Sequence, residues 1–174
     1  ELGSLDALNA VVDDALRAAG LGGANCVQVL GLDGHIDVER LRAAAGRLAE
    51  RHPLTTARLY QRWWTYWPRW QLFTDGRIPV EVVDAADGAD PANLAERCLR
   101  EYVDPREHSP VRLLLARGRE GQDVLVLRWS HVLTDARGAD MLMRVLGEEY
   151  SQQMSANSGS VGLRPEPLRF ERRR

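Results

Sequence analysis

Apolar residues recur along the chain in two spacings, and together they predict four helices and several short strands. Spacing of three to four positions over residues 5–18, 37–51 and 94–102, and again after residue 136, predicts amphipathic helices. Short apolar runs predict strands at residues 26–30, 79–83, 111–116 and 124–129, and a strand-like stretch covers residues 54–73. The polar segment 117–123 predicts a hairpin between the last two strands.

This order of elements predicts an α+β fold in which helices form a second layer on a mostly antiparallel sheet. Pro79 places the strand at residues 79–83 at an edge of that sheet. Residues 151–162 are rich in Ser, Asn and Gly, which predicts a linker. We therefore expect one domain over residues 1–155, followed by a linker and tail over residues 156–174.

Composition narrows the functional classes. The 174 residues are 44% hydrophobic, which is enough for one domain with a core and too much for disorder. The net charge of -2 gives no general attraction to nucleic acid, and all 23 basic residues are arginine, which excludes lysine chemistry. No apolar stretch approaches a transmembrane span, and the first residues do not resemble a signal peptide, so we expect a cytoplasmic protein.

The two cysteines, Cys26 and Cys98, lie far apart in sequence within periodic segments. A single disulfide and a pair of buried thiols are both compatible with this pattern, and the thiols are favoured because free cysteine packs as a small hydrophobic residue. No Cys/His cluster has zinc spacing, so we expect no metal.

The candidate chemistry lies between the last strand and the last helix. His131 follows the strand, Asp135 comes four residues later, and Gly138 lies in the first turn of the helix. Imidazole titrates near neutral pH, and a strand end would fix it as a general base, while Asp135 would orient the loop or cap the helix and Gly138 would allow a tight turn. The alternative is a histidine that completes a hydrogen-bond network beside an ordinary capping aspartate.

A second feature is a cluster of four tryptophans within eight positions, Trp63, Trp64, Trp67 and Trp70. On a strand they would occupy both faces, which leaves a sizeable apolar surface to be covered. One interpretation is core packing with ordinary surface aromatics. The other is a contact surface for a missing half-domain, a second copy of the chain or an acyl chain. Stacking on nucleic-acid bases is disfavoured because arginine is not concentrated there.

Three blocks of sequence resemble a known superfamily. Residues 130–136, Ser-His-Val-Leu-Thr-Asp-Ala, resemble the HHxxxDG motif of condensation-domain and chloramphenicol acetyltransferase-like acyltransferases, which include wax ester synthases and alcohol acetyltransferases. Residues 4–8 are similar to the opening helix of the wax ester synthase type, and residues 32–54 resemble its stretch ending in RHP-x-L. The resemblance covers about residues 4–150 and only the N-terminal half of the family fold.

The resemblance implies half of a chloramphenicol acetyltransferase-like fold with His131 at the position of the second motif histidine. In that family, the second motif histidine lies in a tunnel between the two halves of the fold. It deprotonates or positions the hydroxyl or amine that attacks a thioester. Asp135 would pair with an arginine and, with Ser130 and Gly138, support the loop. The donor would be a coenzyme A or phosphopantetheine thioester, on a carrier protein in the second case, with no permanently bound cofactor.

The sequence departs from the family pattern in three ways. Ser130 replaces the first motif histidine, Ala136 replaces the motif glycine, and no DFGWG-like segment is present. We therefore expect an acyltransferase that needs a C-terminal half-domain or a homo-oligomeric partner to be active. The alternative is a non-catalytic half-domain, a binding or assembly module that pairs with itself or with a second chain.

Overall fold

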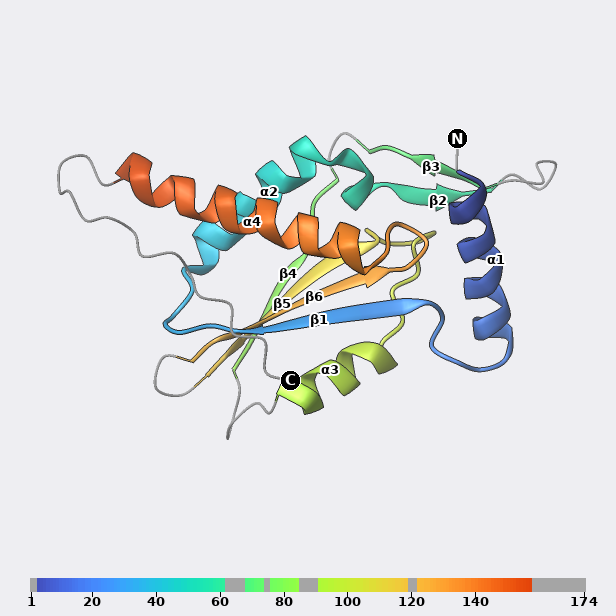
Figure 1. Ribbon diagram of the computed structural model, residues 1–174, viewed down its shortest axis with the longest axis horizontal. Coiled ribbons are helices and arrows are strands. Elements are labelled where there is room, and N and C mark those ends of the chain that lie inside the picture. Colours follow the sequence, from blue (N-terminus) through green and yellow to red (C-terminus); the bar gives the residue numbers. More distant parts are fainter. Residues whose placement is uncertain (1–2, 62–67, 74–75, 85–90, 119–121, 158–174) are drawn as a thin grey trace.

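The computed structural model describes residues 3–61, 68–73, 76–84, 91–118 and 122–157 (Figure 1). Four helices, one short 3-10 helix and six strands alternate along these residues. In chain order they are α1 Ser4–Ala18, β1 Asn25–Gly31, α2 Val38–Arg51, η1 Pro53–Thr56, β2 Arg58–Tyr60, β3 Arg69–Gln71, β4 Val80–Asp84, α3 Pro91–Arg100, β5 Val111–Arg117, β6 Val124–Ser130 and α4 Ala136–Asn157.

A four-stranded sheet in the order β1-β6-β5-β4 forms the centre of the fold. The β1–β6 and β5–β6 pairs are antiparallel and the β4–β5 pair is parallel. The mostly antiparallel sheet and the α+β class are therefore confirmed, as is the edge position of the strand that follows Pro79. The strands β2 and β3 form a separate two-stranded ribbon.

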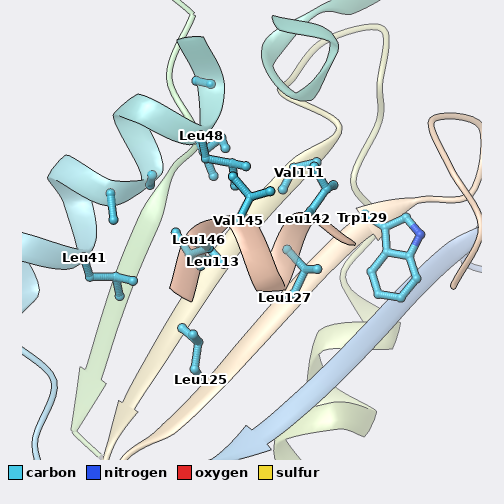
Figure 2. Close-up of a cluster of buried hydrophobic side chains, with 14 of the residues drawn as sticks. Leu41, Leu48, Val111, Leu113, Leu125, Leu127, Trp129, Leu142, Val145 and Leu146 are labelled. Atoms are coloured by element: carbon cyan, nitrogen blue, oxygen red, sulfur yellow. The ribbon is translucent and has the colours of Figure 1, made fainter. Parts of the chain in front are cut away.

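Helices α2 and α4 lie together on one face of the sheet, where the larger core forms (Figures 1 and 2). Figure 2 shows leucines of α2 and α4 meeting leucines of β5 and β6, with Trp129 at one end of the cluster. The cross-strand alternation of a sheet explains the pattern, since Leu113, Leu125 and Leu127 point to this face. This layer matches the expected packing of helices on a sheet.

Helix α3 lies on the opposite face of the sheet (Figure 1). It adds a second helical layer to the sheet and the single layer of helices that the sequence predicts. Leu94 and Cys98 of this helix pack against Leu114 and Val126 of the sheet. Both faces of β5 and β6 are thus covered, which is why β6 is buried along its whole length.

The cysteines occupy opposite faces of the sheet. Cys26 packs against the α2/α4 core and Cys98 belongs to the α3 core. Both are free thiols, as favoured from the sequence, but only Cys98 is fully buried, whereas Cys26 is half-buried. Burial raises the pKa of both thiols, so neither is activated as a nucleophile.

Two local expectations were wrong. Residues 54–56 belong to the 3-10 helix η1 and not to a strand, because Pro53 starts a helical turn in which the Thr55 and Thr56 hydroxyls donate to nearby carbonyl oxygens. Helix α4 continues to Asn157, so it includes the first part of the predicted linker. The Ser151 hydroxyl bonds the Gly147 carbonyl oxygen at 2.8 Å, which places it within the helix.

Candidate functional site

His131 lies in the turn that joins β6 to α4 and is half-buried. Its backbone is held from two sides. The His131 N–H donates to the Ala24 carbonyl oxygen at 2.8 Å, and the Asn9 side-chain amide of α1 donates to the His131 carbonyl oxygen at 3.4 Å. These bonds fix where the imidazole leaves the chain, at the end of a central strand.

The residues on either side of His131 are completely buried. Ser130 and Val132 are both 0% exposed. The Ser130 Oγ accepts a hydrogen bond from the Val132 N–H at 3.3 Å, and the Leu133 N–H bonds the Ser130 carbonyl oxygen at 3.0 Å. A tight turn results, in which half-buried His131 lies between two completely buried residues.

The imidazole of His131 has no hydrogen-bond partner on either ring nitrogen among the residues that the structure describes. This differs from the alternative in which the histidine completes a buried network. The Ser130 hydroxyl is occupied by the turn, and Asp135 faces the first turn of α4, so the three side chains do not form a Ser-His-Asp relay. Within the part of the chain that the structure describes, neither Ser130 nor Asp135 engages the imidazole.

Asp135 is the N-cap of α4. Its Oδ1 accepts a hydrogen bond from the Gly138 N–H at 2.9 Å, and its carbonyl oxygen accepts from the Ala139 N–H at 3.0 Å. Within the described ranges, no ion pair joins Asp135 to an arginine, the partner that the resemblance implies. The carboxylate therefore stabilises the loop through the helix terminus.

Gly138 has a packing role. A side chain at this position would overlap the Thr134 side chain, which lies against the first turn of α4. The Thr134 carbonyl oxygen accepts a hydrogen bond from the Trp129 indole N–H at 3.0 Å, so the same turn is tied to the buried end of β6. The absence of a Cβ at Gly138 thus lets the turn close on the helix.

Trp70 is the one member of the tryptophan cluster that the structure describes. It is half-buried and packs against Ala10, Leu59 and Val132, the last of these being the neighbour of His131. This contact joins the β2/β3 ribbon, α1 and the His131 turn. Trp63, Trp64 and Trp67 lie outside the described residues.

Two residues near functional or structural centres have no signal in the sequence. Asn9 is an ordinary polar position of a helix until the fold brings it to the His131 carbonyl oxygen. Asp123, in the predicted hairpin, is a buried carboxylate that accepts bonds from the Ile36 N–H at 2.8 Å, His35 Nδ1 at 3.0 Å and Arg117 Nη1 at 2.8 Å. Only the tertiary fold identifies these partners.

The electrostatics of Asp123 indicate a structural role. Burial by itself would raise the pKa of its carboxyl, but the hydrogen bonds from Ile36 and His35 and the charge of Arg117 outweigh burial and lower the pKa. Asp123 precedes β6 and His131 follows it, so the two are separated by the length of the strand, roughly 25 Å. A shallow hollow lies at the Asp123 end and is therefore remote from His131; its lining residues are His35, Ile36, Asp37, Val38, Glu39 and Arg117.

The described part of the chain contains no group of three or more His, Cys, Asp or Glu side chains placed to hold a metal ion. Among the same residues, no helix combines the length and the apolar character needed to span a membrane.

Comparison with known proteins places the fold. Neither a family model nor a curated protein sequence matches the chain. Among solved structures, the starter condensation domain of rhizomide synthetase RzmA is 16% identical with a TM-score of 0.72, and the match covers 95% of this chain and 39% of that one. This chain has a condensation-domain-like fold.

Two further structures agree with that assignment. The X-domain in its complex with OxyB from teicoplanin biosynthesis is 22% identical with a TM-score of 0.74, covering 94% of this chain and 34% of that one. The tallysomycin biosynthesis protein TlmII is 26% identical with a TM-score of 0.69, covering 87% and 37%. The chain thus spans little more than a third of the length of the condensation-domain structures it matches.

Proposed function

We propose that this condensation-domain-like chain is the part of an acyltransferase that carries the general base, His131. The observation that supports the proposal best is that half-buried His131 lies in a turn whose flanking residues, Ser130 and Val132, are completely buried, while its imidazole makes no hydrogen bond among the described residues. A base must be fixed in space and have a free ring nitrogen, and His131 combines both features in the described structure.

The proposed reaction moves an acyl group from a coenzyme A or carrier-bound phosphopantetheine thioester to a hydroxyl or amine. The acceptor oxygen or nitrogen attacks the thioester carbonyl carbon while His131 takes its proton. The new C–O or C–N bond forms, the C–S bond breaks, and the imidazolium returns the proton to the departing thiolate. No metal or oxidant is needed for this balance, and Ser130 takes no part because its hydroxyl accepts the Val132 N–H.

The length of the chain bears on how the site would be completed. Because the match covers 34% to 39% of these three solved structures, the given sequence would supply one wall of the site, and a further segment or chain would supply the second wall. That second wall would be a following half-domain, a second chain or another copy of this one. The acyl chain and the acceptor would be selected jointly by both walls.

The test uses the tagged chain purified from its own source under conditions that retain bound partners. His131→Ala should abolish thiol release from an acyl-coenzyme A or acyl-carrier donor while leaving the melting temperature unchanged. His108→Ala is the matched control, since His108 is exposed and lies in a separate loop. Full transfer by the His131 variant would remove this residue from the mechanism.

A non-catalytic binding module is the second candidate, and the surface of α1 favours it. Leu8, Val11 and Val12 are exposed, whereas Ala7 and Ala10 of the same helix are buried. A solved X-domain with this fold is found in complex with OxyB, so a fold of this kind can serve as a binding partner. An exposed apolar helix face is typical of an interaction surface.

Size measurement separates the two candidates. A binding module would form a dimer or a complex with a co-purifying chain that Val11→Glu disrupts and His131→Ala leaves intact, and it would show no thioester turnover. An enzyme would lose turnover with His131→Ala in an assembly of unchanged mass. Light scattering combined with the thiol-release assay reads both quantities from one preparation.

A further inference from the structure

Two arginines lie directly opposite each other on the central strands. Arg112 of β5 and Arg128 of β6 are register partners in the antiparallel pair, on the face that α3 covers. Side chains at such positions start about 5 Å apart, and like charges placed there repel. The sheet therefore holds two arginine side chains at facing positions, where apolar residues would be more stable.

The two arginines have too few acceptors among the described residues. Arg128 is 4% exposed, and its Nη1 and Nη2 bond the side chain and the carbonyl oxygen of Glu101 at 2.9 and 2.7 Å. Its Nε is buried without an acceptor. The Nε of half-buried Arg112 is buried without an acceptor too, and the Arg112 side chain makes no hydrogen bond among the described residues. Buried guanidinium donors without acceptors are costly.

The neighbouring charges do not remove this deficit. Glu101 is committed to Arg128, and its side chain is itself half-exposed. Glu81 of β4 lies near enough to act on Arg112 electrostatically, yet it is exposed and forms no hydrogen bond with Arg112. Burial, followed by the charge of Arg128, lowers the pKa of Arg112, in keeping with the facing positions of the two arginines.

We propose that Arg112 and Arg128 form a binding site for an oxyanion, a carboxylate or phosphate group, on the α3 face of the sheet. A planar guanidinium presents paired N–H donors that match two oxygens of either group. Arg112 provides the donors that face the ligand, and Arg128, held by Glu101, adds charge behind it. This site does not involve His131, so an experiment on it can fail or succeed independently of the proposed acyl transfer.

The test is thermal unfolding of the chain in inorganic phosphate, in acetate and in chloride of equal ionic strength. A bound oxyanion raises the melting temperature by roughly 4 °C at ten times its dissociation constant. Exclusion of phosphate from protein surfaces also stabilises, but it acts on every variant equally. Phosphate and acetate therefore have to be compared across variants, and the one that gives the larger site-specific rise identifies the ligand group.

Arg112→Gln should lose the oxyanion-specific rise, and Arg42→Gln should keep it, since Arg42 is an exposed arginine of α2 that pairs with Glu39. Glu101→Gln gives a second measurement: removal of the competing carboxylate should lower the melting temperature in chloride and enlarge the rise in the oxyanion. Equal responses of the wild-type chain and Arg112→Gln to both oxyanions would overturn the proposal.

Discussion

The hydroxyl of Tyr102 donates a hydrogen bond of 2.6 Å to Oδ2 of Asp13, a carboxylate that is 0% exposed. The other oxygen, Oδ1, accepts the Ala24 N–H at 2.7 Å. Gly23 has a φ of +69°, and a side chain there would overlap the Tyr102 ring and the Asp13 carboxylate. This contact ties α1 to the segment that leads into β1 and to the segment that follows α3, and α1 in turn carries Asn9 to the His131 turn.

Tyr102→Phe should destabilise the fold because it leaves a buried carboxylate oxygen without its donor. The expected loss is about 1–3 kcal/mol in the free energy of unfolding, measured by urea denaturation. Burial and the bond to Asp13 raise the pKa of Tyr102, so the hydroxyl is protonated at all neutral pH values. Tyr60→Phe is the control because Tyr60 is exposed on β2. Equal stability of the two variants would contradict the assigned role.

The role of Asp135 predicts a graded response to substitution. Asp135→Ala removes the N-cap of α4 and should cost about 1 kcal/mol, whereas Asp135→Asn keeps a capping oxygen and should cost a few tenths of that amount. If Asp135 acted mainly through an ion pair with an arginine, the asparagine variant would lose as much as the alanine variant. Thermal unfolding of the two variants in parallel decides between cap and ion pair.

The elements that the sequence predicts correctly depend on residues close together in the chain. Helical periodicity predicts α1, α2 and α3, because it depends on residues a few positions apart. The extension of α4 to Asn157 was missed because Ser and Asn are equally common in linkers and at helix ends.

In the candidate site, too, some features follow from the local sequence and others only from tertiary packing. The strand end at His131 and the capping residue four positions later follow from local pattern. The bond from Asn9 and the opposition of Arg112 and Arg128 follow from packing and strand register, which a single sequence does not encode locally. The sequence predicts that Gly138 allows a tight backbone turn. In the fold, the glycine is required because a side chain at this position would overlap the Thr134 side chain.

The buried carboxylate of Asp123 predicts how stability changes with acid. Its folded-state pKa is lower than the usual value, so the folded state binds the proton more weakly than the unfolded state does. The stabilisation is present above the unfolded pKa of about 4 and is lost as the pH falls through the folded pKa. As the pH falls from about 5 to about 3, the chain should therefore unfold at a lower urea concentration.

Asp123→Asn should flatten that part of the pH profile while lowering stability at neutral pH, because the amide no longer attracts Arg117 and its nitrogen faces N–H donors. Asp33→Asn is the matched control, since Asp33 is a nearby carboxylate for which no such set of donors is present in the described structure. The measurement is the urea midpoint of each variant across this pH range. An Asp123→Asn profile as steep as that of the wild-type chain would contradict the prediction, because other carboxylates would then govern the loss of stability in acid.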